Sequence, residues 1–266
     1  PRLDGERGSA CHVLEAAATL EPEHVVVVVG HGRDQVTAHL AEIAPWVLVV
    51  VQEQQRGTGH AVRIALDDLQ ARGLDVSGGP VIVLTGDTPL LTGATLLALA
   101  DEHRAVEAEA TVLTARLTDP TGYGRIVREG SGAVARIVEH KDASAVELDI
   151  DEINSGMYAF SASSLRDALG RVTTDNAQGE EYLTDVIGIL RDQGSPVAAS
   201  LCADSTEILG VNDRVQLAQA AAIMRDRINT GWMREGVAIL DPASTWLDVD
   251  VELEADVTIL PSTTLR

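Results

Sequence analysis

The chain has 266 residues, of which 45% are hydrophobic and only 3% aromatic, and its formal net charge is -21. This length suffices to bury a core that needs no disulfide bonds or structural metals. A core of Val, Leu, Ile and Ala is typical of parallel strands under helices. The negative charge excludes an unaided nucleic-acid binder, because phosphate backbones are held by clustered Lys and Arg. A phosphate ligand would need local Arg side chains, backbone amides or a divalent metal.

The two cysteines, Cys11 and Cys202, lie far apart in the sequence and lack the spacing of a metal site. We expect both to be small core residues and not a disulfide. No stretch approaches the ~18 uncharged apolar residues of a membrane span, and no signal peptide is visible. The sequence therefore predicts a soluble, cytoplasmic protein with no membrane partner.

Short Val-rich runs in the first 100 residues predict buried strands, each followed by a loop that contains glycine. These strands are expected at residues 25–29, 47–51 and 81–84. Helical periodicity is found at residues 12–20, 35–43, 61–69 and 94–107. Buried strands that alternate with helices predict right-handed crossovers and a parallel sheet, with the ligand crevice at the carboxyl ends of the strands.

The pattern changes to shorter, more alternating strands in the middle of the chain. These strands are expected at residues 111–117, 125–128, 133–138 and 156–160. We interpret them as a mixed or antiparallel insertion that covers the ligand. Helical periodicity returns at residues 163–169, 182–193 and 214–233, and the last helix is long enough to bridge to another unit.

Aliphatic residues recur every six positions after Gly236. One series is Leu247, Leu253, Ile259 and Leu265, and a second is Val251 and Val257. A six-residue period fits a parallel β-helix, in which each side of the triangular coil takes one repeat. Two ordinary strands with chance spacing remain the alternative, because so few repeats are present.

The loop after the second predicted strand reads QEQQRGTGHA over residues 52–61. Gly57 and Gly59 would let the backbone approach a ligand closely, and the helix that follows offers its N-terminal amides to polar atoms. An ordinary strand-to-helix loop, with glycines for turning, explains these residues equally well. Glycines alone do not define a site here.

Asp87 lies in the sequence TGDTPL, directly after the third predicted strand. Mg2+ prefers hard oxygen ligands and usually takes only one or two from the protein, so Asp87 suits that role. A helix N-cap or turn Asp is the more common interpretation of this residue by itself. Gly124, Glu139 and Asn154 are likewise more typical of turns or solvated charge when each is taken alone.

The combination of motifs over residues 52 to 214 is far more specific than its parts. In chain order the motifs are QxxxxGTGHA, GDxPL, GYGR, IVEHKD, INSG, EEYLTD and GVNDR. The series closely resembles the uridylyltransferase domain of the bifunctional bacterial N-acetylglucosamine-1-phosphate uridyltransferase/glucosamine-1-phosphate acetyltransferase family. The similarity runs from about His12 to the last residue, and the six-residue repeats resemble the start of that family's left-handed β-helix.

The resemblance implies an α/β, Rossmann-like nucleotidyltransferase domain with a mixed, mostly parallel sheet, followed by the start of a left-handed parallel β-helix. The implied parts are a uridylyltransferase domain at residues 1–213, a linker helix at 214–236 and the first coils of a truncated β-helix at 237–266. The implied reaction joins UTP and N-acetylglucosamine 1-phosphate into UDP-N-acetylglucosamine and pyrophosphate, with Mg2+ as cofactor. A homotrimer is expected for the full-length protein, because the complete β-helix of the family trimerises.

The resemblance also gives roles to the residues at matching positions. Gln52 and the backbone of Gly57 and Thr58 would read the uracil edge, and Thr85 would lie beside the nucleotide. Asp87 and Asn212 would be the catalytic, metal-binding pair, with Asn212 also in contact with substrate. The residues on the N-acetylglucosamine side would be Gly124, Glu139, Asn154, Tyr182 and Thr184.

One departure concerns the triphosphate. The family opens with a glycine-rich loop that carries an Arg, followed by a Lys near a Pro, and no such loop precedes His12. We expect the natural N-terminus to lie upstream of Pro1, the acetyltransferase site to lie beyond this chain, and turnover by this chain as it stands to be low.

Two other functions stay open at this point. One is a related enzyme that joins another sugar 1-phosphate to UTP or dTTP, which Glu139, Asn154 and the six-residue repeats disfavour. The other is a nucleotide-sugar-binding module that has lost its phosphate loop. A glycine-rich loop with Arg and Lys in the full-length gene product would decide for the enzyme.

Overall fold

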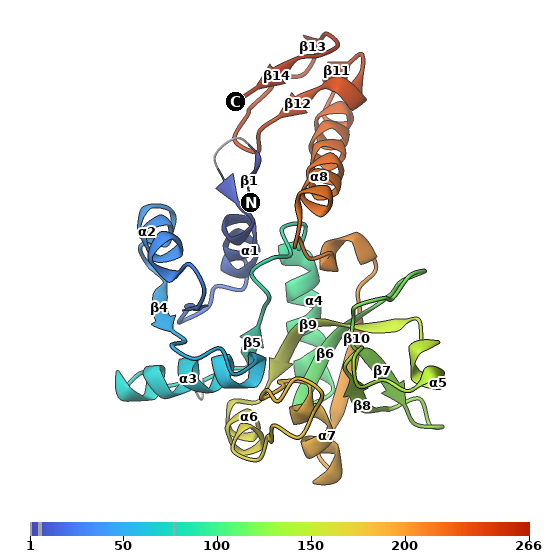
Figure 1. Cartoon of the computed structure of the whole chain (residues 1–266). Coiled ribbons are helices and arrows are strands. Elements are labelled where there is room, and N and C mark those ends of the chain that lie inside the picture. The colour runs from blue at the N-terminus through green and yellow to red at the C-terminus, as the bar shows by residue number, and fades with distance from the viewer. Residues whose placement is uncertain (1, 5–6, 77) are drawn as a thin grey trace. The chain divides into compact units, whose positions relative to one another are not determined.

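The computed structural model describes residues 2–4, 7–76 and 78–266, and the chain forms two compact units (Figure 1). Unit 1 consists of Pro1–Ala16, Gly86–Thr92 and Thr206–Arg266. Unit 2 consists of Ala17–Thr85 and Gly93–Ser205.

A mixed sheet forms the centre of unit 2. Its strands are β5 (Val81–Val83), β6 (Ala110–Arg116), β7 (Arg125–Arg128), β8 (Val134–Val138), β9 (Glu152–Phe160) and β10 (Val197–Leu201). The order is β10-β6-β9-β7-β8, with β5 also paired to β9. β6 and β10 are parallel, whereas β9 runs antiparallel to β5, β6 and β7. The expected mixed sheet is therefore confirmed, with β5, β6, β7 and β10 in one direction.

The strands that we interpreted as an insertion over the ligand belong to this sheet, with β6, β9 and β7 inside it and β8 at its edge. Nearly every residue of β6 and β9 is buried, and the two strands pair along most of their length. For β6 and β9 the insertion interpretation is wrong, because helices cover both faces of these two strands and burial does not alternate along them. β9 is antiparallel to β6, within the mixed or antiparallel arrangement that we expected for these strands.

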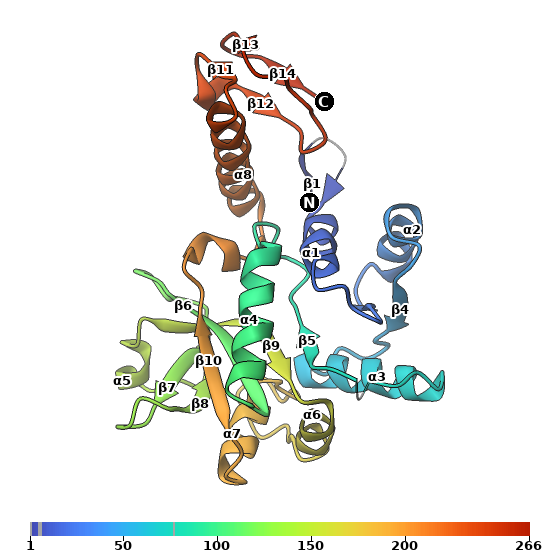
Figure 2. The ribbon, with the colours of Figure 1, turned by 180° about the vertical axis from the view of Figure 1, so that it is seen from behind.

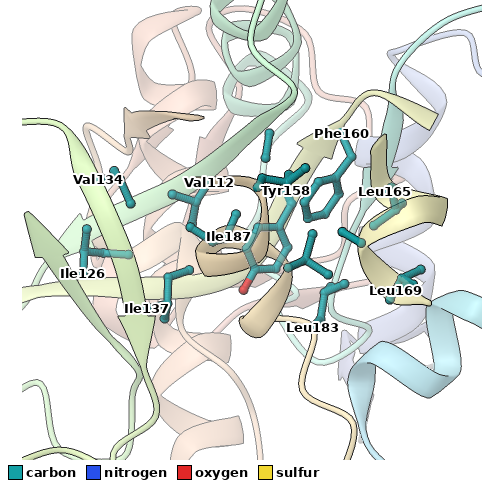
Figure 3. Close-up of a cluster of buried hydrophobic side chains, with 14 of the residues drawn as sticks. Val112, Ile126, Val134, Ile137, Tyr158, Phe160, Leu165, Leu169, Leu183 and Ile187 are labelled. Atoms are coloured by element: carbon teal, nitrogen blue, oxygen red, sulfur yellow. The ribbon is translucent and has the colours of Figure 1, made fainter. Parts of the chain in front are cut away.

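Helices cover the sheet on both sides. On one face α4 (Gly93–Ala105) reaches β6 through a hydrogen bond between His103 Nδ1 and Thr111 Oγ1 at 3.0 Å, and Figure 2 shows this helix along the sheet. Neighbouring residues of a strand point to opposite faces, so Val112 faces the other side. There α6 (Ala162–Leu169) and α7 (Asp185–Asp192) form the main core with the sheet (Figure 3).

The first two Val-rich runs form a separate parallel pair, β3 (Val26–Val29) and β4 (Leu48–Val51). α2 (Arg33–Ile43) follows β3, and α3 (Thr58–Ala71) follows β4. The third run, β5, pairs with β9 instead. We expected all three runs to pair in parallel. Among the pairings that the structure describes, this holds for β3 and β4 only.

In unit 1, α8 (Arg214–Arg234) is followed by four short strands. They are β11 (Ala238–Ile239), β12 (Trp246–Leu247), β13 (Thr258–Ile259) and β14 (Thr264–Leu265). β11 pairs in parallel with β13, and β12 with β14. The series Leu247, Leu253, Ile259 and Leu265 packs into one core with Ile228 and Trp232 of α8. This series therefore marks the inward face of the segment, whereas Val257 of the second series is exposed.

The remaining elements are short, apart from α1, which begins three residues before His12. They are β1 (Arg2–Asp4), β2 (Arg7–Gly8), α1 (Ser9–Ala18), α5 (Ala145–Leu148) and 3-10 turns at Ser205–Ile208 and Pro242–Ser244. Cys202 is buried and Cys11 half-buried, and these two cysteines form no disulfide. Across the described residues, no helix combines the length and apolarity needed to cross a membrane.

Candidate active site

The loop between β4 and α3 lies against residues 180–184, which we call the strap. The backbone N–H of Glu181 donates to the carbonyl oxygen of Arg56 at 2.7 Å. In return, Gly59 N–H donates to the carbonyl oxygen of Glu181 at 2.8 Å. These paired backbone bonds fix the strap across the start of α3, and they satisfy one of the amides that a helix N-terminus leaves without an internal partner.

Side chains add to this attachment. Leu183 N–H donates to Thr58 Oγ1 at 3.1 Å. Arg63, one turn into α3, forms an ion pair with Glu181 at 2.6 Å, and the Glu181 side chain is only 14% exposed. Removal from water strengthens such a pair relative to an exposed one. The strap is thus held by backbone, hydroxyl and charged contacts together.

The structure gives a new reason for the glycines of this loop. Gly57 has φ +108°, and a Cβ there would lie 2.5 Å from the carbonyl oxygen of Glu181. A Cβ at Gly59 would lie 2.9 Å from the same atom. From the sequence, close approach to a ligand and an ordinary turn explained these glycines equally well, whereas in the structure the backbone approaches the strap closely. The local sequence could not show whether the close neighbour is a ligand or the strap, because the strap is over a hundred residues away in the chain.

The Gln52 side chain is fixed by two acceptors. Its Nε2 donates to the carbonyl oxygen of Gly57 at 3.1 Å and makes a second hydrogen bond to His60 Nδ1 at 2.9 Å. A primary amide has two N–H donors, so these bonds use both of them. The carbonyl oxygen Oε1 is what Gln52 then offers to a ligand.

The far end of the strap meets the ends of β7 and β8. Thr184 Oγ1 donates to Glu139 Oε1 at 3.0 Å. A Cβ at Gly124 would lie 3.5 Å from Glu139 Oε2, so the carboxylate passes close to this backbone. Burial raises the pKa of Glu139, and Asp142 and Asp185 also raise it, whereas the hydrogen bond from Thr184 lowers it.

Strand β9 links this corner to the end of β5. Asn154 N–H donates to the carbonyl oxygen of Gly124 at 2.9 Å, and Asn154 Oδ1 accepts from Gly156 N–H at 3.0 Å. Gly156 has φ +80°, and a Cβ there would lie 2.9 Å from Thr85 Cγ2. Thr85 therefore packs directly against β9 beside Asn154.

Tyr182 occupies the middle of the strap and is buried. Its hydroxyl has no hydrogen bond of normal geometry within the described chain, although Gln178 lies near it. Burial raises the pKa of this hydroxyl, which therefore stays protonated near neutral pH. A buried phenol with hydrogen-bonding capacity to spare is suited to contact a polar ligand.

The residues predicted for the nucleotide and the sugar are thus joined by one continuous series of contacts in unit 2. The series runs through Gln52, Gly57, the strap, Thr184, Glu139, Gly124, Asn154, Gly156 and Thr85. Thr58 and Tyr182 lie on the same path. The structure brings these residues together, whereas their individual roles stay predictions.

The predicted metal-binding pair is in unit 1. Val211 N–H donates to the carbonyl oxygen of Asp87 at 2.8 Å. A Cβ at Gly210 would lie 3.1 Å from Asp87 Oδ2 and 3.7 Å from Asn212 Nδ2. The carboxylate and the amide therefore border the space that a side chain at Gly210 would fill.

This arrangement fits the chemistry of Mg2+. Within the part of the chain that the structure describes, no three His, Cys, Asp or Glu side chains form a metal-binding cluster. Mg2+ does not need such a cluster, because it keeps waters and phosphate oxygens and takes one or two oxygens from protein. Asp87 and Asn212 can supply those oxygens.

The segment that carries Asp87 is held by a buried carboxylate. Glu207, 8% exposed, accepts hydrogen bonds from both the backbone N–H and the hydroxyl of Thr92, each at 2.9 Å. Arg227 of α8 donates to the carbonyl oxygen of Leu90 at 2.6 Å and to Thr206 Oγ1 at 2.9 Å. These contacts attach the segment after Asp87 to the residues just before Asn212.

Replacing Glu207 by Ala is expected to lower the free energy of unfolding by about 2 kcal/mol, because the backbone N–H and hydroxyl of half-buried Thr92 lose this acceptor. Urea denaturation measures this change. The control is Glu235→Ala, since Glu235 is exposed at the end of α8 and should change stability little. Equal effects of the two substitutions would contradict the role given to Glu207.

Several residues of this region were not singled out from the sequence. His60 and Glu181 lie inside motifs that we recognised, so the sequence indicated that they are near the site. It did not indicate which residues they contact. Arg63 and Glu207 carried no signal, because an Arg on a helix and an isolated Glu are ordinary surface residues in a sequence. Their contacts join residues more than a hundred positions apart.

Comparison with known proteins bears on the whole chain. It is 60% identical over 256 residues to the bifunctional protein GlmU of Streptomyces coelicolor. The aligned region covers 96% of this chain and 52% of that protein. The GlmU proteins of Corynebacterium glutamicum, at 54% over 266 residues, and Thermobifida fusca, at 52% over 255, match 98% and 96% of this chain. The chain spans about half the length of these curated relatives.

A family model covers most of the chain as well. The nucleotidyl transferase model matches residues 10–250, which include every predicted site residue from Gln52 to Asn212. The matched range also contains all of the motifs from residue 52 to 214. This chain belongs to the nucleotidyl transferase family.

Proposed function

We propose that this chain transfers the uridylyl group of UTP to N-acetylglucosamine 1-phosphate, which gives UDP-N-acetylglucosamine and pyrophosphate. The observation that carries the proposal is the continuous series of contacts from Gln52 through the strap to Glu139 and Asn154. It joins the residues assigned to uracil with those assigned to the sugar. The identity to several bifunctional GlmU proteins supports the same assignment.

The uracil is proposed to lie at the start of α3. Gln52 Oε1 would accept from the N3–H of the base, since both N–H groups of the amide are already donated. Thr58 is the first residue of α3, so its N–H lacks a partner within the helix and can donate to a uracil carbonyl. Together with Gly57 this gives the base a donor and an acceptor at fixed positions.

The N-acetylglucosamine moiety is proposed to lie at the other end of the strap. Glu139, oriented by Thr184, would accept from sugar hydroxyl groups. Asn154 and the backbone at Gly124 would add amide contacts, with Tyr182 lining the pocket and Thr85 beside the nucleotide. A polar pocket of this kind favours its sugar because unpaired buried polar groups penalise a poorly matched one.

The proposed chemistry is in-line displacement with no covalent intermediate on the protein. A phosphate oxygen of the sugar 1-phosphate forms a bond to the α-phosphorus of UTP, and the bond from that phosphorus to the bridging oxygen breaks, so pyrophosphate leaves. The chain contributes positioning of the two substrates. Asp87 and Asn212 would hold Mg2+, which when bound neutralises phosphate charge.

The proposal extends to the organisation of the chain. Residues 1–213 would be the nucleotidyltransferase domain, 214–236 a linker helix and 237–266 the first coils of a left-handed β-helix. Trp246 pairs with Thr264, three six-residue repeats further on, which supports one complete turn of such a coil.

We also propose a homotrimer for the full-length protein and a cytoplasmic location. Leu240 follows β11 and Leu260 follows the neighbouring strand β13, and both side chains are 61% exposed. They leave an apolar surface for another subunit. The two cysteines, neither in a disulfide, agree with a reducing compartment. The product would serve cell-wall peptidoglycan synthesis.

A pyrophosphate-release assay on the full-length gene product tests the reaction. With UTP and Mg2+, release is expected with N-acetylglucosamine 1-phosphate and much less with glucose 1-phosphate, galactose 1-phosphate or glucosamine 1-phosphate. Equal release with glucose 1-phosphate, or faster release with dTTP than with UTP, would contradict the proposal. UDP-N-acetylglucosamine binding without any release would indicate a binding module.

Replacing Gln52 by Ala is expected to weaken UTP binding by roughly 1 to 3 kcal/mol, because polar uracil atoms lose their partner. Binding of N-acetylglucosamine 1-phosphate should be nearly unchanged, since Gln52 is assigned to the base. Separate calorimetric titrations of the two ligands measure both effects. Equal losses for the two ligands would indicate a folding defect and remove the assignment.

A further inference from the structure

His60 is a residue to which the proposed reaction gives no role, yet it is in contact with the uracil-reading side chain. Gln52 Nε2 hydrogen-bonds His60 Nδ1 at 2.9 Å and the carbonyl oxygen of Gly57 at 3.1 Å. We propose that His60 is a positioning residue that fixes the orientation of the Gln52 amide and thereby selects uracil over cytosine. This inference rests on the proposed function.

The selection follows from the hydrogen-bonding edges of the two bases. Uracil presents a donor at N3, whereas cytosine presents an acceptor there. While Gly57 and His60 accept both amide protons, Gln52 can offer only its carbonyl oxygen. That oxygen matches uracil and faces cytosine acceptor to acceptor. Without an acceptor at position 60 one of the two amide protons is released, and that N–H can donate to cytosine, although Gly57 still accepts the other.

The protonation state of His60 decides whether it can accept. Nδ1 is an acceptor only in the neutral ring whose proton is on Nε2. Burial lowers the pKa of His60, and Arg63 and Arg56 lower it further, while Glu181 raises it. The neutral ring therefore persists to lower pH than for a free His. Once it is protonated, Nδ1 donates and the amide must turn its oxygen towards the ring.

Two substitutions at one position separate this role from packing. In His60→Asn the side-chain oxygen can occupy about the place of Nδ1 and accept the same hydrogen bond. In His60→Leu the shape is roughly kept but no acceptor remains. Binding of UTP and CTP in excess Mg2+, measured by titration calorimetry on the full-length protein, gives the ratio of the two affinities for each variant.

The preference for UTP over CTP should fall roughly tenfold or more in His60→Leu, because one amide N–H of Gln52 becomes available to cytosine. His60→Asn should keep most of the preference. His39→Leu serves as the matched control, since His39 lies on α2 away from Gln52 in sequence and should keep the full preference.

A second measurement follows pH. The UTP preference of the wild-type protein should be constant above neutral pH and should fall as the pH drops below the ordinary His value of about 6.5. It should stay flat in His60→Asn, which has no titrating ring. A role in packing alone predicts neither this pH dependence nor its loss in His60→Asn.

The outcomes distinguish the inference from the proposed function. An unchanged UTP preference in His60→Leu, or an equal loss in both His60 variants, overturns the positioning role. A pH profile of His60→Asn that matches the wild-type profile overturns it as well. A wild-type protein that does not prefer UTP to CTP instead overturns the proposed uridylyl donor.

Discussion

Alanine in place of Asp87 is expected to reduce pyrophosphate release roughly a hundredfold or more, equivalent to about 3 kcal/mol of transition-state stabilisation. Asp87 is the only charged side chain of the proposed metal pair, and its carboxylate borders the space left by Gly210. A chain with a net charge of -21 has few other means to neutralise phosphate oxygens. Asn212→Ala should act in the same direction but less severely, because a neutral ligand is lost.

Rates measured across a range of Mg2+ concentrations test this expectation. Mn2+ binding followed by electron paramagnetic resonance adds a readout that does not depend on turnover, and Asp87→Ala should weaken it. Asp175→Ala is the matched control, since Asp175 is exposed and lies outside the assigned residues. Normal turnover of Asp87→Ala at limiting Mg2+ would exclude Asp87 as a ligand.

Alanine in place of Gly57 is expected to lower the free energy of unfolding by roughly 3 kcal/mol and to weaken UTP binding severely. The backbone of Gly57 is at φ +108° and ψ 177°, a region that is essentially limited to glycine. In addition, the new Cβ would lie 2.5 Å from the carbonyl oxygen of Glu181. That oxygen is held by Gly59 N–H, so the strap and the start of α3 would have to separate.

Two other glycines distinguish the cost of backbone strain from the cost of a steric clash at the new Cβ. Gly73 has φ +72° with no atom within 4 Å of a Cβ, so Gly73→Ala should cost only about 1 kcal/mol. Gly79 has neither a positive φ nor a close neighbour, so Gly79→Ala should be nearly neutral. Urea denaturation and UTP titration of the three variants give the comparison. A Gly57→Ala variant as stable as Gly73→Ala would remove the proposed role of the strap.

The local elements were predictable because their signals are local. The Val-rich runs and the helices after them appear within a few residues of their expected bounds. An exception is α7, expected from residue 182, which begins at Asp185. Residues 182–184 belong to the predicted helix but form the end of the strap, where Glu181 bonds through its backbone to Arg56 and Gly59, and Leu183 N–H donates to Thr58 Oγ1. β10, at Val197–Leu201, was not expected at all, since Ala and Ser make up most of it and give little β-strand signal.

The sequence by itself determined which family the chain resembles, which residues are assigned to the site, and the six-residue period of the last thirty residues. Motif identity and periodicity are carried by neighbours in the chain. Only the tertiary structure decided that β5 pairs with β9, that Gly57 faces the strap, and which way the Gln52 amide points. Each of these depends on a hydrogen bond or a close contact with a partner whose position the local pattern does not specify. For Gln52 the partner is only eight residues away, yet the choice still depends on which ring nitrogen of His60 accepts.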